Sequence, residues 1–362
     1  MSEKQDVIVV GGGVIGLASA WRLAQQGLSV AVLERGEPGG GATHVAAGML
    51  APVTEAEFGD EPMLDERLAA AEAWPAFAAE LAQAGGIDCG YRRNGCLTVA
   101  LDADELAEIR RHHEFRLELG LVAEWLLPTA CRELEPALST RTAGGSFTPD
   151  DGEVDPRTLT RALLAALARQ GVPVHTSTEV VAAELDGDRL TGVRTAHGTH
   201  HAASVVILAA GCWSGSCTWL PEAARPAVRP VKGQVVRLRG SADEPVIERT
   251  IRTPEVYVVP RATGEVVVGA TVEERGFDTT VTAGAVHELL REAYRAVPEL
   301  AELEFVEASA GLRPGTPDNV PVVERGELDG LVIATGHYRN GILLAPTAAA
   351  RVVELVAERA VA

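Results

Sequence analysis

The chain has 362 residues, of which 46% are hydrophobic, and a formal net charge of −19 at pH 7. A chain of this length can bury a substantial core and divide into about two domains, and its acidic balance disfavours nucleic acid and anionic membrane as partners, because their phosphates carry the same sign of charge. No apolar stretch reaches the length of a membrane span and residues 1–6 are too short and polar for a signal peptide, so we expect a soluble, cytoplasmic protein.

The chain opens with a predicted strand, a glycine-rich turn and a helix. Residues 7–10 are an apolar β-branched run typical of a buried parallel strand, and Gly11, Gly13 and Gly16 follow with G-x-G-x-x-G spacing. The first glycine permits a tight turn, the second lets a pyrophosphate approach the backbone, and the third lets the helix lie close to the strand. The helix is predicted over residues 14–26, and its N-terminal amides face the phosphates.

An acidic residue completes this unit. A second apolar strand over residues 29–33 delivers Glu34 to the ribose hydroxyls of a dinucleotide. A second glycine-rich stretch at 36–41 and the small residues of 42–52 follow, and small residues at this density let the backbone crowd against a bulky flat ligand. Strand, glycines, helix, strand and acid, in this order, predict a bound dinucleotide.

The next part of the chain is predicted to be largely helical. The apolar spacing indicates helices over 69–84 and 102–120, the second with Asp102 and Glu105 placed like a capping box. We expect both helices in a second, substrate-side domain. A further helix over 155–171 begins with an Asp-Pro pair and ends at a glycine.

Strands of two kinds follow. A strand is expected at 172–175, and the run at 205–211 is typical of a fully buried strand that returns the chain to the nucleotide side of the parallel sheet. Between 229 and 271 apolar and polar residues alternate, which favours antiparallel sheet, with a hairpin at Thr263-Gly264. A helix over 283–297 covers one side of this sheet.

The end of the chain returns to the nucleotide domain. A last strand at 331–335 leads into a loop at 336–346 and a final alanine-rich helix that ends near Arg359. The organisation is therefore α/β, with two interleaved domains and no sequential linker between them.

Cysteines and histidines do not indicate a metal site. The five cysteines are odd in number and form no C-x-x-C pair, which argues against a disulfide scaffold and a zinc site. The histidines at 197, 200 and 201 lie between two strand-like runs and are interpreted as a polar turn. We expect Cys212 and Cys217 to be buried or unused thiols.

Six segments together carry a family resemblance: Gly11 to Gly16 with Glu34, and residues 46–50, 257–261, 267–271, 310–318 and 336–346. With them the chain resembles the flavin-dependent amine oxidoreductases that include D-amino-acid oxidase and sarcosine oxidase, and most of all the glycine oxidases of thiamine biosynthesis. The segments span nearly the whole chain. The last two are the most specific, because an ordinary Rossmann dehydrogenase has no reason to keep them.

The resemblance implies an α/β fold in which a Rossmann-type FAD-binding domain, of the glutathione-reductase-2-like kind, is interleaved with an antiparallel-sheet substrate domain. The FAD-binding domain is expected to comprise residues 1–50, 145–220 and 305–362, and the substrate domain 51–144 and 221–304. The resemblance also implies a homotetramer. Some relatives tether flavin through a cysteine in the C-terminal third, but no cysteine follows Cys217 here, so noncovalent FAD is predicted.

FAD would lie extended between the two domains. Backbone amides at the start of the final helix are suited to stabilise negative charge on the reduced flavin. Val180, expected at the end of a parallel strand, either contacts the adenine through its backbone or is a core residue. The implied cofactor-binding residues are Gly11, Gly13, Val14, Ile15, Gly16, Glu34, Arg35, Thr43, Ala46, Ala47, Gly48, Met49, Val180, Gly211, His337, Tyr338, Arg339, Asn340, Gly341, Ile342 and Leu343.

Three residues are candidates for binding a small amino acid. Arg313, expected in a rigid turn, can pair bidentately with the substrate carboxylate, and Tyr257 can donate its hydroxyl to the same group. Arg339 either closes the site or binds through its backbone. The alternatives are a surface ion pair for Arg313, an interior strand position for Tyr257, and a phosphate-side or structural role for Arg339. His337 is expected to be structural, since hydride transfer needs no histidine base.

The implied reaction is FAD-dependent oxidative deamination of glycine, other small amines or D-amino acids, with molecular oxygen as acceptor and hydrogen peroxide as product. Two alternatives are a dehydrogenase of the same fold with another electron acceptor, and a flavin subunit of a hetero-oligomeric amine-oxidising complex. Two departures from the best known glycine oxidases leave substrate preference open: Glu255 stands where they have histidine, and Val272 where they have methionine.

Overall fold

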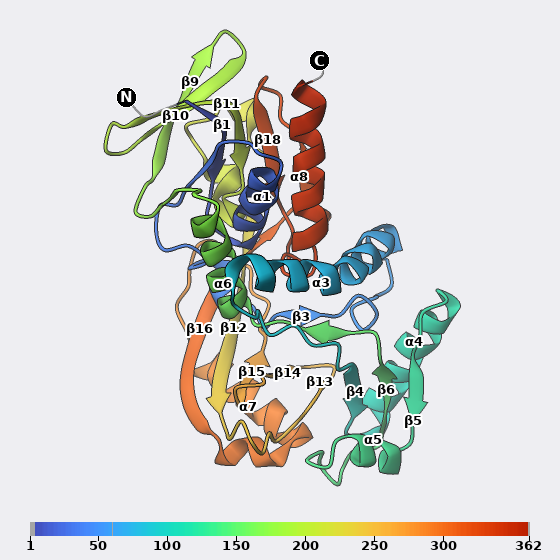
Figure 1. The fold of residues 1–362 in the computed structure, drawn as a ribbon. Helices are drawn as coiled ribbons and strands as arrows, with labels where there is room; N and C mark the ends of the chain where they lie inside the picture. The colour runs from blue at the N-terminus through green and yellow to red at the C-terminus, as the bar shows by residue number, and fades with distance from the viewer. Residues whose placement is uncertain (1–3, 60, 361–362) are drawn as a thin grey trace.

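In the computed structural model, which describes residues 4–59 and 61–360, two large sheets lie at opposite ends of an elongated molecule, and both termini lie at the end that holds the first sheet (Figure 1). Within the described residues, no helix combines the length and the apolar character needed to cross a membrane. The predicted fold class, an α/β nucleotide-binding domain joined to an antiparallel-sheet domain, is confirmed.

The first sheet is built around parallel strands in the order β17-β18-β11-β1-β2-β8. The β9–β10 hairpin extends it, because β10 pairs with β11, and β17 joins as an antiparallel edge strand. The strands are β1 (Gln5–Val10), β2 (Val30–Leu33), β8 (Val174–His175), β9 (Val180–Asp186), β10 (Arg189–Thr195), β11 (His200–Leu208), β17 (Val322–Arg325) and β18 (Leu331–Thr335). The strands predicted at 7–10, 29–33, 172–175, 205–211 and 331–335 are confirmed as β1, β2, β8, β11 and β18, with shifts of a few residues at their ends.

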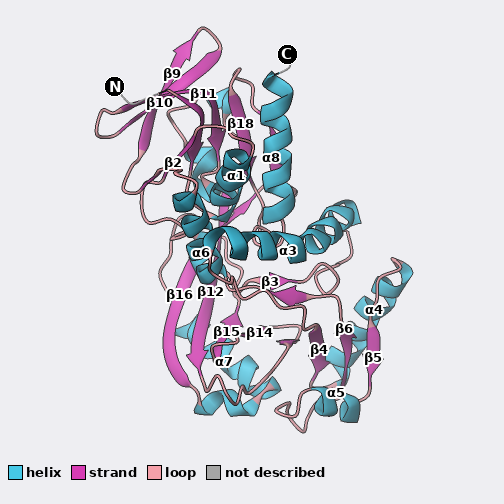
Figure 2. Ribbon diagram, viewed as in Figure 1, coloured by secondary structure: helices cyan, strands magenta, loops and turns pink. Residues whose placement is uncertain are grey.

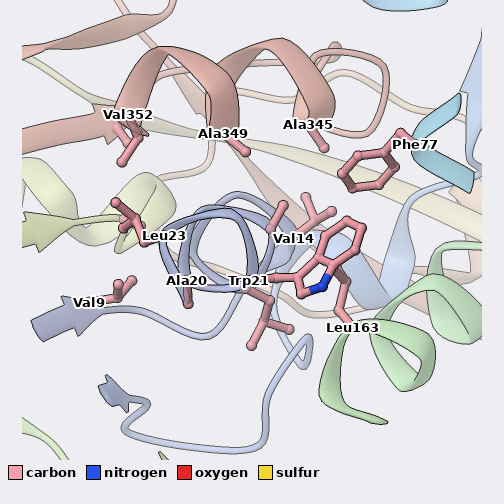
Figure 3. Close-up of a cluster of buried hydrophobic side chains, with 14 of the residues drawn as sticks. Val9, Val14, Ala20, Trp21, Leu23, Phe77, Leu163, Ala345, Ala349 and Val352 are labelled. Atoms are coloured by element: carbon pink, nitrogen blue, oxygen red, sulfur yellow. The ribbon is translucent and has the colours of Figure 1, made fainter. Parts of the chain in front are cut away.

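Helices cover the first sheet with a largely apolar interface. They are α1 (Val14–Gln25), α3 (Leu64–Gly85), α6 (Pro156–Arg169) and α8 (Ala345–Ala360). Trp21 of α1 is fully buried and meets Phe77 of α3 edge to face, with ring centroids 5.3 Å apart. Figure 3 shows α1 side chains packed between Ala349 of α8, Leu163 of α6 and the strand residue Val9. This core fixes the N-terminus of α1 against the end of β1.

The second sheet is mainly antiparallel, in the order β16-β12-β15-β14-β13-β4-β6-β5. Its strands are β4 (Cys96–Ala100), β5 (Glu124–Leu126), β6 (Gly144–Thr148), β12 (Arg229–Arg239), β13 (Thr250–Arg252), β14 (Tyr257–Pro260), β15 (Glu265–Gly269) and β16 (Glu304–Gly315). The predicted hairpin at Thr263-Gly264 connects β14 and β15 and is confirmed. Helix α7 (Ala283–Ala296) packs against this sheet, as Figure 2 also shows.

The remaining elements are mostly short. They are α2 (Ala42–Val45), α4 (Ala103–Glu118), α5 (Pro128–Leu134), the β3 (Met49–Leu50) and β7 (Gly152–Glu153) pair, and the 3-10 turns at Glu61–Met63, Gly211–Ser216, Glu222–Ala224 and Pro298–Glu302. In chain order the strands alternate between the two sheets. Strands β1 and β2 belong to the first sheet, β4 to β6 to the second, β8 to β11 to the first, β12 to β16 to the second, and β17 and β18 to the first. This agrees with the interleaved organisation, while the predicted domain borders stay a prediction.

Two local predictions were wrong. Arg313 does not lie in a turn: it belongs to the long strand β16, where it pairs with Val231 of β12. Proline is tolerated beside it because β16 is the edge strand of the sheet. Val180 does not end a parallel strand either, since it is the first residue of β9 and pairs antiparallel with Thr195.

Candidate active site

A cavity of about 750 Å³ runs between the two sheets. At one end it is lined by the turn after β1 and by Glu34 after β2, and at the other end by Tyr257 of β14 and Arg313 of β16. This volume is within the range of cofactor and substrate pockets. The cavity therefore joins the predicted nucleotide site to the predicted substrate residues.

Two glycines at the nucleotide end leave no room for side chains, and a third has room for a Cβ. A Cβ at Gly11 would lie 2.3 Å from the carbonyl oxygen of Ala209, and a Cβ at Gly16 would lie 2.0 Å from the carbonyl oxygen of Gly11. At Gly13, which lines the cavity, the nearest atom would be Thr43 Oγ1 at 3.6 Å. The start of α1 is thus open toward the cavity and can receive a phosphate.

The Glu34 carboxylate is held in place by backbone amides. Oε2 accepts a hydrogen bond from the Gly12 amide at 2.7 Å, and Oε1 accepts one from the Gly36 amide at 2.8 Å. Each oxygen retains acceptor capacity, so the group can also bind ribose hydroxyls. Beside it, the Arg35 guanidinium lies over the ring of Trp213 at 4.1 Å from the centroid. Trp213 also lines the cavity, and no sequence motif indicated it.

Most residues predicted to bind the cofactor line this cavity: Gly11, Gly13, Val14, Ile15, Glu34, Arg35, Thr43, Ala46, Ala47, Gly48, Met49, Val180, Gly211, His337, Tyr338, Arg339, Gly341 and Ile342. Gly16, Asn340 and Leu343 do not line it. Gly16 lets α1 approach β1, the Asn340 amide donates to the His337 carbonyl at 2.8 Å, and the Leu343 carbonyl accepts a hydrogen bond from Trp74 Nε1 at 2.8 Å.

The loop after β18 is hydrogen-bonded to the end of β16. The Tyr338 amide donates to the Pro314 carbonyl at 2.9 Å, and His337 forms an isolated bridge with Gly315. His337 is only 2% exposed, and burial lowers the pKa of its imidazole to about 4. Its Nε2 atom has no hydrogen-bond partner among the described residues. His337 is therefore neutral at pH 7 and presents an unused polar atom in the cavity wall.

At the substrate end, Arg313 and Tyr257 each lie over a glycine of a neighbouring strand. A Cβ at Gly233 would lie 2.3 Å from Arg313 Nη1, and a Cβ at Gly269 would lie 2.4 Å from the Tyr257 hydroxyl. Arg313 Nη1 donates to the carbonyls of Thr271 at 3.0 Å and Lys232 at 3.2 Å. These bonds fix the guanidinium through one nitrogen, and its other N–H donors can meet a carboxylate.

Arg339 lines the cavity and pairs with an acid from another element. Its Nη2 lies 3.5 Å from Glu57 Oε1, which also accepts a hydrogen bond from Arg252 Nη2 at 3.3 Å. Burial acts to raise the pKa of Glu57, but Arg339 and Arg252 outweigh it and hold this pKa below its usual value. Glu57 is thus an ionised anchor between the two arginines.

At the substrate end, the acid that lines the cavity is not the one that the sequence suggested. Glu255 is exposed and Val272 is 60% exposed, and neither lines the cavity. Glu55, which no motif indicated, does line it. Its side chain is 16% exposed, and its carboxylate lies 3.9 Å from Arg252 Nη1.

Three arginines hold the backbone of the segment 44–47 that lines the cavity. Arg157 Nε donates to the His44 carbonyl at 3.1 Å, and Arg237 Nη2 contacts the carbonyls of His44 and Ala46 at 3.3 and 3.4 Å. Arg261 donates to the Ala47 carbonyl. Since Arg237 and Arg261 belong to the second sheet and its hairpin, these bonds tie the two halves together at the site.

The thiols and histidines add no metal site. The residues that the structure describes contain no group of three His, Cys, Asp or Glu side chains able to hold a metal ion. All five cysteines are free. Burial raises the pKa of the Cys212 thiol to about 12 and that of Cys217 to about 11, so both are protonated at neutral pH.

Sequence comparisons match the full chain. The profile of the DAO family, described as FAD dependent oxidoreductase, matches residues 6–355. A glycine oxidase of Geobacillus kaustophilus is 36% identical over 363 residues, which cover 98% of this chain and 94% of that protein. The bifunctional protein ThiO/ThiG of Synechocystis is 36% identical over 366 residues, which cover 100% of this chain and 53% of that protein. The chain thus spans about half of this second relative.

Comparison with solved structures agrees with these sequence matches. The crystal structure of glycine oxidase from Geobacillus kaustophilus superposes with a TM-score of 0.90 at 35% identity, covering 99% of this chain and 95% of that chain. The crystal structure of an iminodiacetate oxidase from Chelativorans superposes with a TM-score of 0.88 at 25% identity, covering 97% and 95%.

Proposed function

The chain belongs to the DAO family of FAD-dependent oxidoreductases and is related to glycine oxidase, and from this premise we propose that it deaminates glycine and other small amines or D-amino acids oxidatively. The products are an imine, which hydrolyses to a 2-oxo acid and ammonia, and hydrogen peroxide formed from oxygen. The observation that carries this proposal is that Arg313 and Tyr257 both line the cavity that begins at the nucleotide-binding glycines.

The residues present fit FAD. The open start of α1, the fixed Glu34 carboxylate and the buried residue His337 all belong to the lining of one continuous cavity. Gly13, Val14 and Thr43 would hold the pyrophosphate, and Glu34 the ribose. The segment 46–49 and the loop 336–342 would hold the ring. When bound, FAD supplies the acceptor for the hydride that leaves the substrate's α-carbon.

Arg313 binds the substrate carboxylate, and Tyr257 donates its hydroxyl to the same group. Together they orient the α-carbon toward the flavin side of the cavity, so that the chain contributes mostly by positioning. The amine must lose its ammonium proton before hydride transfer, and no general base is needed for the α-hydrogen. Arg339 closes the site from the loop that follows β18.

FAD is held without a covalent bond in this proposal. The physiological role is formation of the imine used in thiamine (thiazole) biosynthesis, an assignment supported by the resemblance to the glycine oxidases of that pathway and by the full-length match to part of a protein named ThiO/ThiG.

The test is anaerobic mixing of the purified yellow protein with glycine, sarcosine, D-alanine and D-proline, followed by admission of air. We expect glycine to bleach the flavin absorbance, and air to restore it with formation of peroxide. Bleaching without reoxidation by air would replace the oxidase proposal with a dehydrogenase. Absence of bleaching by all four compounds would contradict the proposed substrate class.

A further inference from the structure

The substrate end of the cavity carries both signs of charge. Arg313 and Glu55 both line this end, and the charges of both affect the pKa of Tyr257. Resting on the proposed function, we propose that Glu55 recognises the ammonium group of the arriving amino acid and makes the site prefer amino acids with one carboxylate over amines that carry a second carboxylate.

The backbone around Glu55 holds the side chain in place. The residue lies in the turns between β3 and α3, where its amide donates to the Ala51 carbonyl at 3.1 Å. Its own carbonyl accepts a hydrogen bond at 2.8 Å from Nη1 of Arg67, which is 1% exposed. Neither bond involves the carboxylate. These bonds hold the backbone at Glu55 and leave its carboxylate available for a ligand.

The Glu55 carboxylate is only weakly neutralised by the protein. Within residues 4–59 and 61–360 its one ion pair is with Arg252 Nη1 at 3.9 Å, too long for a hydrogen bond. Arg252 directs its other nitrogen to Glu57 at 3.3 Å, and its Nη1 has no hydrogen-bond partner among the same residues. An acid with unused acceptor capacity in a cavity wall is suited to bind a cation with N–H donors.

The electrostatics around Tyr257 agree with this arrangement. Burial raises the pKa of its phenol, the positive charge of Arg313 opposes the rise, and the negative charge of Glu55 adds to it. The phenol of Tyr257 is thus within electrostatic range of both a cation and an anion. An amino acid with its carboxylate at Arg313 and its ammonium group toward Glu55 complements both charges. A second carboxylate on the amine would face Glu55 and be repelled.

The experiment uses the FAD-loaded protein and the variant Glu55→Gln, which keeps the shape of the side chain and both backbone hydrogen bonds. The ligands are glycine and glycolate, which has the same carboxylate but a neutral hydroxyl in place of the ammonium group. The Kd for glycine comes from the concentration dependence of anaerobic flavin reduction, and the Kd for glycolate from its perturbation of the flavin spectrum. Iminodiacetate serves as the amine with a second carboxylate.

We expect Glu55→Gln to raise the Kd for glycine about 10- to 100-fold, as is typical for removal of one partner of a charge pair. The Kd for glycolate stays within about twofold because its hydroxyl is uncharged, and iminodiacetate binds more tightly. The matched control is Glu255→Gln, which removes the same charge from an exposed position outside the cavity and should change none of these values.

Equal changes in the Kd of glycine and glycolate, or no change in either, would overturn the role of Glu55 while the proposed reaction stands. If glycine reduces the wild-type flavin but Glu55→Gln unfolds, Glu55→Asp provides the same comparison, with a smaller loss of glycine binding expected. Failure of every amine to reduce the wild-type protein would instead remove the proposed function, and the ammonium-binding role with it.

Discussion

At the scale of single residues, the proposal depends most on Arg313. We expect Arg313→Ala to weaken binding of glycine by about 2 to 5 kcal/mol, the typical loss for one partner of a buried charge pair. The measurement is the glycine concentration that half-saturates anaerobic flavin reduction. Arg275→Ala removes an exposed arginine and should leave this value unchanged. Unaltered reduction of Arg313→Ala by glycine would show that the carboxylate binds elsewhere.

Gly233 controls where the Arg313 guanidinium lies. An added methyl group would meet Nη1 and Nη2 at 2.3 and 2.4 Å, but these atoms end a flexible side chain, so the arginine can move aside. We expect Gly233→Ala to keep the stability of the fold and to weaken glycine binding about 10- to 100-fold, because the anchor is misplaced. Gly284→Ala is the control, since a Cβ there meets no atom within 4 Å; in helix α7 it should leave binding unchanged and stabilise by up to about 1 kcal/mol.

Buried His337 makes stability depend on pH. In the unfolded chain the imidazole titrates near pH 6.5, whereas in the folded protein burial lowers its pKa to about 4. Above pH 6.5 both states are neutral at this position, and stability is unaffected. As the pH falls from 6.5 to 4, the unfolded state takes up the proton first, so stability declines by about 3 kcal/mol and then levels off.

Urea denaturation of the wild type and of His337→Gln between pH 4 and pH 8 measures this effect. The decline below pH 6.5 should be shallower in the variant, by an amount close to the contribution of one histidine. Parallel curves for the two proteins would show that His337 does not titrate in this way.

The sequence identified residues with a motif and missed those without one. Glu34 was predictable because the order of strand, glycines, helix and strand places it. Glu55 was not, because it is one of 51 acidic residues and no local pattern distinguishes it. Glu255 attracted attention through its position two residues before Tyr257, yet its side chain is exposed. Which acid faces a cavity depends on tertiary packing, which no short pattern contains.

At the scale of elements, Arg237 of β12 matters because it connects the second sheet to the flavin side. Its side chain is fully buried, pairs with Glu265 at 2.6 Å and Glu307 at 3.3 Å, and contacts the carbonyls of His44 and Ala46. We expect Arg237→Met to lose about 1.5 to 3 kcal/mol of stability, because it removes the charged hydrogen bonds that a buried guanidinium makes to the partly buried Glu265 and to the backbone. FAD should also dissociate more readily from the loosened segment.

Thermal unfolding and the Kd for FAD test this expectation, with Arg239→Met, at the exposed end of the same strand, as the control. If Arg237→Met retained FAD as tightly as the wild type, the bonds to the segment 44–47 would have no role in holding the cofactor.

The parallel strands were predictable as elements, and several antiparallel ones were not. Buried parallel strands are continuous apolar runs, as in β1 and β18, and are recognised without their neighbours. By contrast, β6 has the sequence GGSFT and is a strand only because β4 and β5 pair with it. The segment around Arg313 suggested a turn because of Gly311 and Pro314, and only its pairing with β12 makes it a strand.

At the scale of the whole molecule, the cavity proposed to hold FAD lies between the two halves. Acid precipitation of the yellow protein should leave FAD in the supernatant and a colourless pellet, and yellow colour in the pellet would contradict noncovalent binding. Because FAD binds the folded state, its removal should lower the Tm, and added FAD should raise the Tm again. A Tm independent of FAD concentration would show that the cavity does not hold the cofactor in the folded state.

The alternation of the chain between the two sheets also has a consequence for its synthesis on the ribosome. Strand β1 is central in its sheet, but its neighbour β11 begins at His200, and the strand beside β11 begins at Leu331. The cavity wall includes residues from Val10 to Ile342. A nascent chain therefore has no complete cavity wall until Ile342 has been translated, and capture of the cofactor must wait until then.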